Sequence, residues 1–167
     1  MSREFSVGGD GLTIVNAVVT LVGYLPNAAP NINFENLRMW ASQAAGAVSA
    51  QQRIEVVTQV TAFPTVVTAT PRPLKFGDTV VSALVGVGGA LTAGKCGINA
   101  SAEGAGAKTV AWGDSFNHLN GYLWVATPRE TMVMPAGSAS SLGLFLPVAP
   151  TGGVTTNWAA GINYGEI

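Results

Sequence analysis

The sequence predicts an all-β protein that forms a single β-sandwich domain of about nine or ten strands. Three observations lead to this fold class. The chain of 167 residues is 48% hydrophobic, and its 21 glycines and 9 prolines divide it into short apolar runs. Charged residues make up only 10% of it, and none lies between Thr131 and Gly165. A chain of this length can bury one core without disulfides or metals.

The N-terminal part is expected to enter the sandwich after a short lead-in. Residues 1–11 are rich in glycine and are predicted to be flexible, which leaves residues 12–167 as the single β-sandwich domain. The run over residues 12–24 is dense in Val, Ile, Leu and Thr and predicts a long first strand that is buried on both faces. Pro26 and Pro30 are expected to end that strand.

Residues 33–52 fit either a strand or a short helix. Apolar residues recur there at helical spacing, but those around Met39 also alternate with polar ones, as in a strand. We favour a strand over residues 35–43 and keep a short helix near residues 33–52 as the alternative. The next run, residues 53–61, predicts a half-buried strand because apolar side chains alternate there with mostly polar ones.

The middle of the chain predicts shorter strands between turns. A strand is expected over residues 65–70, and Pro71-Arg72-Pro73 is a stiff connector that should cross an edge or an end of a sheet. Gly77-Asp78 should form a turn that feeds an apolar strand reaching Val85. The glycine-rich section over residues 86–106 should hold short strands and a loop.

A β-hairpin over residues 120–135 is the clearest local prediction. Two apolar runs, Tyr122–Val125 and Thr131–Met134, flank the turn Thr127–Glu130. The absence of charge from Thr131 onward predicts that both faces of the hairpin are covered. Three further strands are expected before and after it, over residues 108–112, 142–147 and 157–167.

No group of residues identifies a reaction, and we expect no enzyme activity. Gly113-Asp114-Ser115 is similar to the short motif around the nucleophile of one lipase and esterase group, and His118 stands nearby. That group takes its base from a late Asp-x-x-His, which this chain lacks. The motif is therefore interpreted as a turn, and His118 as a solvated loop residue.

Cofactors and metals are not expected either. Gly86–Gly94 lacks the ending of a phosphate-binding loop, and its glycines do not have the dinucleotide spacing. Cys96 is the only cysteine and His118 the only histidine, so a zinc site of the usual four ligands is not predicted. The carboxylates are scattered, without a pair that suggests glycosidase chemistry.

The charge and the N-terminal sequence limit which partners and which location are expected. The net charge is −1 and the eight Lys and Arg residues are spread singly, which argues against direct binding of nucleic acid. Two uncharged runs, residues 11–34 and 79–94, are too interrupted by Asn, Pro or Gly to predict membrane segments. The N-terminus lacks the apolar core of a signal peptide, so synthesis in the cytoplasm is expected.

Three short stretches resemble the small trimeric jelly-roll proteins of tailed bacteriophages that decorate capsids or form the knobs of head and tail fibres. They are Phe76–Val80 with its Gly-Asp turn, the run Gly121–Pro135 and the terminal strand Trp158–Ile167. The resemblance implies a jelly-roll-like β-sandwich similar to tumour-necrosis-factor and C1q domains. It also implies a structural, non-enzymatic role in a virion, made in the host cytoplasm, with a capsid or another virion protein as partner.

The low charge also favours self-association, and a homotrimer is the expected form. Neutral surface of this extent would make a monomer prone to aggregate, so a partner subunit should cover it. Two alternatives are a carbohydrate-binding or adhesin module, in which an exposed tryptophan stacks on a sugar, and a small-virus capsid protein. The residues expected at the subunit interface are large and apolar: Tyr122, Trp124, Trp158, Ile162 and Tyr164.

Overall fold

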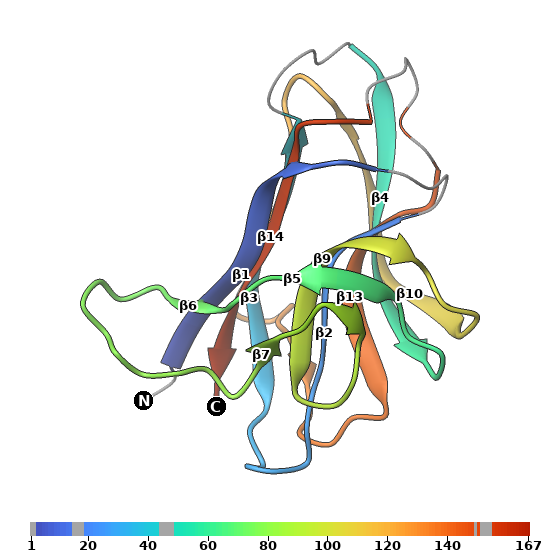
Figure 1. The fold of residues 1–167 in the computed structure, drawn as a ribbon. Helices are drawn as coiled ribbons and strands as arrows, with labels where there is room; N and C mark the ends of the chain where they lie inside the picture. Colours follow the sequence, from blue (N-terminus) through green and yellow to red (C-terminus); the bar gives the residue numbers. More distant parts are fainter. Residues whose placement is uncertain (1–2, 15–18, 44–48, 149, 151–154) are drawn as a thin grey trace.

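The computed structural model is a sandwich of two β-sheets (Figure 1). It describes residues 3–14, 19–43, 49–148, 150 and 155–167, and this part of the chain contains no helix and hence none that could cross a membrane. The predicted all-β sandwich is confirmed. The strands are β1 (Arg3–Leu12), β2 (Val19–Leu25), β3 (Phe34–Gln43), β4 (Gln51–Val60), β5 (Thr65–Thr68), β6 (Arg72–Pro73), β7 (Val85–Gly86), β8 (Gly89–Ala90), β9 (Lys95–Ala102), β10 (Ala107–Asn117), β11 (Tyr122–Val125), β12 (Met132–Met134), β13 (Ser140–Leu146) and β14 (Trp158–Glu166).

The six-stranded sheet is built around the C-terminal strand. Its order is β11-β3-β14-β1-β6, and β12 also pairs with β3. β14 is antiparallel to β3 on one side and to β1 on the other. Gly161 therefore lies in a row between Trp40 and Gly8. A strand in this position cannot be removed without separating its two neighbours.

The eight-stranded sheet has the order β10-β4-β13-β2-β9-β5-β8, and β7 adds to β9 in parallel. Residues 61–106, between β4 and β10, contribute β5 to β9. Most of this excursion lengthens the sheet beyond β2, but β6 pairs with β1 at the edge of the other sheet. The chain thus passes from one sheet to the other at Pro71-Arg72-Pro73, as predicted for that stiff connector.

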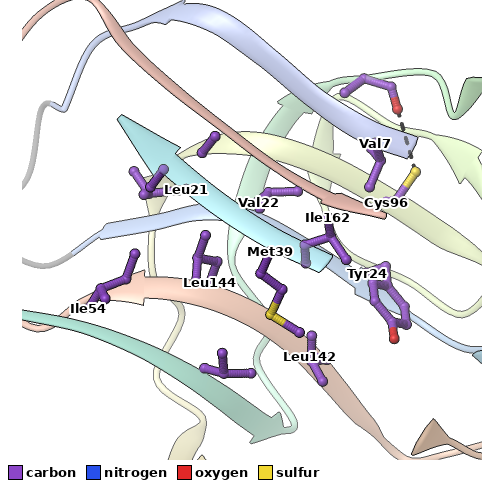
Figure 2. Packing of buried hydrophobic residues seen from close by; sticks show 14 of the residues in the cluster. Val7, Leu21, Val22, Tyr24, Met39, Ile54, Cys96, Leu142, Leu144 and Ile162 are labelled. Atoms are coloured by element: carbon purple, nitrogen blue, oxygen red, sulfur yellow. Dashed lines mark hydrogen bonds between the residues drawn. The ribbon is translucent and has the colours of Figure 1, made fainter. Parts of the chain in front are cut away.

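Side chains from the facing surfaces of the two sheets form the main core (Figure 2). Met39 and Ile162 come from the six-stranded sheet, and Leu142 and Leu144 come from the other. None of these four is more than 2% exposed. Burial of apolar area on this scale is the main stabilising contribution in a domain of this size.

One polar pair lies within this core. The Tyr24 hydroxyl donates a hydrogen bond of 2.9 Å to the side-chain oxygen of Asn36, and the Asn36 amide donates one of 2.9 Å to the carbonyl of Met132. Burial raises the pKa of Tyr24, so its hydroxyl keeps its proton and acts as a donor. The pair ties β2 to β3 and β12 across the sandwich, and loss of either member would leave the other unpaired.

The segment after β9 covers the outer face of the eight-stranded sheet. The Glu103 carboxylate accepts hydrogen bonds from the backbone N–H and, at 2.8 Å, the hydroxyl of Thr20. Lys108 lies 3.3 Å from that carboxylate and 5.1 Å above the Phe145 ring, and the Gln59 amide donates to the Glu103 carbonyl.

Gln59 is 2% exposed, so the solvent-facing polar side predicted for residues 53–61 is wrong over the middle of β4.

Three predictions for the N-terminal half have different outcomes. Residues 3–12 form β1 where a flexible lead-in was expected, because Phe5 and Val7 alternate into the core. The long first strand expected over residues 12–24 is instead the end of β1 and most of β2, with residues 15–18 outside the described part. The strand over residues 35–43 is confirmed as β3. The helix alternative is wrong for residues 33–43 and 49–52, and residues 44–48 lie outside the described part.

The predicted hairpin over residues 120–135 is wrong. β11 and β12 do not pair with each other, since both pair with β3, at Arg38–Ala41 and at Phe34–Asn36. They are two pieces of one interrupted strand, and Thr127–Glu130 is a turn within an outward excursion. The expectation that both faces are covered also fails within one chain, because three outward side chains are about half exposed: Leu123, Val125 and Val133.

The turn at Gly77-Asp78 is confirmed, but the strand expected after it is wrong. The Asp78 carboxylate accepts a hydrogen bond of 2.9 Å from the N–H of Val80, which is the local turn chemistry expected of this residue. No strand follows before the two residues of β7. This stretch instead forms a loop that projects from the sandwich on the side opposite β10 (Figure 1).

Trp158→Ala tests the central position of β14. Trp158 is 0% exposed, so its truncation should leave a cavity and lower the free energy of unfolding by about 3–5 kcal/mol. The matched control is Leu123→Ala on the exposed face, which should change that free energy by about 0.5 kcal/mol or less. Urea unfolding followed by circular dichroism measures both. Equal effects of the two substitutions would contradict the placement of Trp158 in the core.

Candidate functional surfaces

The five residues predicted at a subunit interface lie in the core of a single chain. Trp158, Ile162 and Tyr164 are 0% exposed, and Tyr122 and Trp124 are 7% and 9% exposed. The alternation along the last strand did predict a shared face, but the eight-stranded sheet of the same chain covers it. The fully buried side chains of Trp158, Ile162 and Tyr164 offer no surface to a partner, so a contact between subunits must use more exposed residues.

Ser115 and His118 do not form a nucleophile and base. Gly113-Asp114-Ser115 lies within β10, not in the predicted turn, and Ser115 is exposed at the edge of the sheet. His118 is 1% exposed, so its prediction as a solvated loop residue is wrong. Its ring packs against Trp158 with centroids 5.3 Å apart, and neither ring nitrogen has a hydrogen-bond partner in the described part of the chain.

Cys96 is equally unsuited to act as a nucleophile. Its thiol is buried and donates a weak hydrogen bond of 3.4 Å to the carbonyl of Ala69 (Figure 2). Burial raises the pKa of this thiol to about 12, against the smaller opposing effect of Lys95, so a thiolate does not form near neutral pH. Among the described residues no three His, Cys, Asp or Glu side chains cluster in a way that could hold a metal ion.

The first exposed feature is the Phe76 arm, which we define as residues 74–81. Phe76 is 104% exposed, Val81 is 81% exposed and Leu74 is 43% exposed. Single exposed apolar residues are common on proteins, but three on one projecting loop, with an aromatic ring fully in solvent, form a concentrated apolar surface. The arm extends from the β6 edge of the six-stranded sheet.

Hydrogen bonds fix both ends of the Phe76 arm. At its start, the N–H of Leu74 donates to the carbonyl of Glu4 at 2.9 Å. At its end, the Glu166 carboxylate accepts hydrogen bonds from the Ser82 hydroxyl at 2.6 Å and from the Ala83 N–H at 2.7 Å. The Ser82 oxygen also lies 2.8 Å from the hydroxyl of Tyr164. The arm is therefore held at a defined place by the last residues of β14.

The second feature is a small opening between the two sheets on the opposite flank, which we name the Trp112 recess. Its volume is about 210 Å³. Trp124, 9% exposed, lies at its base, and Trp112, 44% exposed, lies at its rim. The β-bulge between Val110 and Trp112 shifts the alternation of β10 and turns Trp112 toward the opening. The recess is lined by Ala111, Trp112, Trp124, Glu130 and Met132.

The third feature, the Trp40 groove, is lined by β1 and β3 of the six-stranded sheet and by residues of β5 and β9 of the other sheet. It has a volume of about 570 Å³. A Cβ atom on Gly161 would lie 2.7 Å from the Trp40 ring, so the absence of a side chain there lets the indole lie against the sheet. Asp10 and Arg72 supply opposite charges along the lining, together with the hydroxyls of serine and threonine residues. The groove thus combines an aromatic surface with polar groups.

Sequence reasoning missed all three features for different reasons. The turn at Gly77-Asp78 was predicted, but the apolar strand expected after it left the projecting loop around Phe76 unrecognised. Trp112 and Trp124 are brought together by pairing that no local pattern reveals. The contact of Trp40 with Gly161 depends on the pairing of β3 with β14, more than a hundred residues apart in the chain.

Ser82→Ala should loosen the Phe76 arm. The change removes one hydrogen bond to the buried Glu166 carboxylate and one contact of the Tyr164 hydroxyl, a local cost of about 1–3 kcal/mol. Amide hydrogen exchange over residues 74–85 should become faster, while exchange in β3 stays unchanged. Thr127→Ala is the matched control because it removes an exposed hydrogen bond to Glu130. Unchanged exchange in the arm of Ser82→Ala would show that the arm is held by other contacts.

The burial of His118 predicts stability that declines in acid. Burial lowers the pKa of this imidazole below its ordinary value of 6.5, so the unfolded chain binds the proton more readily than the folded protein. The free energy of unfolding should be insensitive to His118 well above that pH and should fall as the pH drops below 6.5. Urea unfolding between about pH 8 and pH 5.5 measures this. His118→Phe should lose this part of the pH dependence, and an identical dependence in both proteins would contradict the prediction.

Comparisons with known proteins give no match. No family model, no curated protein and no solved structure matches this chain. What the protein does must therefore follow from its own strand order and surfaces.

Proposed function

We propose that this protein is a non-enzymatic structural subunit that self-associates and forms part of a virion, as a capsid decoration, fibre or shell protein. The observation that carries the proposal is the strand order, which supports a jelly roll. Jelly rolls have eight principal strands in two four-stranded sheets and occur in viral capsid and lectin domains.

The jelly-roll assignment follows from leaving out the excursion of residues 61–106 and counting β11 and β12 as one strand. Eight principal strands then remain, in the chain order β1, β2, β3, β4, β10, β11/β12, β13 and β14. The first, eighth, third and sixth lie side by side in one sheet, and the second, seventh, fourth and fifth in the other. All of these pairs are antiparallel. This interleaving supports the proposal of a jelly roll, whose strands follow a double Greek key.

Self-association is supported by the exposed apolar surface and the low charge. The Phe76 arm and the Trp112 recess lie on opposite flanks of the six-stranded sheet, at its β6 and β11 edges. Charged residues make up only 10% of the chain, which leaves little surface charge to keep separate copies apart. A three-fold arrangement is the form that we favour, from the trimeric proteins that the sequence resembles.

The mass in solution tests the proposal. Multi-angle light scattering of the purified protein at several concentrations should give a multiple of 17.0 kDa, and electron microscopy should show rings or shells. Binding to empty capsids in a sedimentation assay would identify a decoration protein, and closed shells of this chain alone would identify a capsid protein. A monomer at every concentration, with no capsid binding, would overturn the proposal.

A carbohydrate-binding or adhesin role is the second candidate, and the Trp40 groove favours it. The groove is large enough for a small ligand and combines an indole with a carboxylate, a guanidinium and hydroxyls, which suits a sugar ring with one apolar face and a polar rim. A glycan array should then show binding that Trp40→Ala abolishes. Trp112→Ala is the matched control and should keep it. An array without binding would remove this candidate.

A further inference from the structure

We propose that the Phe76 arm of one copy inserts into the Trp112 recess of a neighbouring copy. The inference rests on the proposed self-association and specifies the surfaces that produce it. Both halves of the contact are present on every chain, one with an exposed apolar side chain and the other with an aromatic opening.

The arm is suited to docking because its apolar tip loses little conformational entropy when two copies associate. Phe76 is 104% exposed and therefore makes no contact that docking would have to break. The hydrogen bonds of Glu166 with Ser82 and Ala83 fix the end of the arm, so less conformational freedom is lost on association. Burial of a phenyl ring in an aromatic site is a typical main contribution to an interface.

The recess is suited to a single side chain. Its volume of about 210 Å³ lies below the range of about 300–1,000 Å³ usual for small-molecule sites, which favours one large side chain over a separate ligand. Trp112 and Trp124 offer ring surfaces to a phenyl group, and Met132 adds a polarizable sulfur that makes favourable contacts with aromatic rings.

Charge favours the same pairing. Lys75 is exposed beside Phe76 on the arm, and Glu130 is exposed at the rim of the recess. Glu130 is held in place by the Thr127 hydroxyl, which donates to its carboxylate at 3.1 Å, and by a hydrogen bond of 3.0 Å from its N–H to the Thr127 carbonyl. Insertion of Phe76 would bring the ammonium group near this carboxylate, and such complementarity sets the orientation of a contact.

The positions of the two surfaces determine the type of assembly. The arm leaves the β6 edge of the six-stranded sheet and the recess adjoins its β11 edge, so one copy cannot pair with another through the same surface on both. The contact is head to tail. Such a contact produces a ring where the rotation between copies closes, and an open chain where it does not.

Disulfide crosslinking tests the contact directly. Lys75→Cys and Glu130→Cys are prepared as separate proteins, and each keeps the buried Cys96, which cannot reach another copy. Under mild oxidation the mixture of the two should form a crosslinked dimer, whereas each protein alone should form far less. The chain that carries both substitutions should give a ladder or a closed ring. Equal crosslinking of each single variant alone, or none in the mixture, would overturn the proposal.

Association constants provide the second test. Phe76→Ser and Trp112→Ala should each raise the Kd of self-association at least about 10-fold, and Leu119→Ser, an exposed substitution outside both surfaces, should leave it unchanged. Lys75→Glu and Glu130→Lys should each weaken association, and the two changes together should restore it to within a few-fold of the original. Because Phe76 contacts nothing within its own chain, its substitution should not alter folding, which circular dichroism checks.

The outcomes separate this inference from the proposed function. If the unmodified protein is an oligomer and Phe76→Ser associates equally tightly, the arm-to-recess contact is wrong while self-association stands. If the unmodified protein is monomeric at every concentration, the arm-to-recess contact and the proposed self-association both fall, and capsid binding alone then decides whether a role in the virion stands. Restoration by the paired charge reversal would support the contact, because loss of folding in a single variant could not be reversed in that way.

Discussion

The burial of β14 between β3 and β1 is the constraint on which the rest of the structure depends. Its inward side chains, Trp158, Ile162 and Tyr164, supply the middle of the core. Its outward Gly161 gives the Trp40 ring room to lie on the sheet, and its Glu166 holds the base of the Phe76 arm. One strand therefore links the core to two of the exposed surfaces. A change in its register would reverse which side chains face inward and would disturb all three.

Buried polar groups give this sandwich much of its specific geometry. Tyr24 and Asn36 are paired within the core, Glu103 accepts from Thr20 on the outer face of the other sheet, and Glu166 binds Ser82 at its edge. The bonds of Glu103 with Thr20 and of Glu166 with Ser82 join residues 83 and 84 positions apart in the chain. Because an unpaired buried polar group is costly, such contacts penalise other arrangements of the strands more strongly than apolar packing does. The bonds of Glu103 and Ser82 hold the excursion of residues 61–106 against the sandwich.

The sequence predicted most strands but few of their partners. Alternation around Met39 identified β3, and the apolar runs near both ends of the chain identified most of β2, β13 and β14. Pairing is non-local, so two neighbouring runs with a turn between them looked like a hairpin when both in fact pair with β3. The surfaces were harder still. The loop that exposes Phe76 is anchored at its end by the hydrogen bond of Ser82 with Glu166, 84 residues further along the chain, which the local pattern does not contain.

The low charge of the chain has two separate physical explanations. The neutral run from Thr131 to Gly165 does not need a partner subunit to cover it, because β13 and β14 lie in the middle of the two sheets and are covered by the same chain. The exposed apolar surface that remains lies mostly outside β13 and β14, on the Phe76 arm and around Trp112. The argument for assembly therefore moves from the C-terminal strand to these two flanks. There the exposed residues are few, but one set projects and the other surrounds an opening, and that difference in shape is what a head-to-tail contact requires.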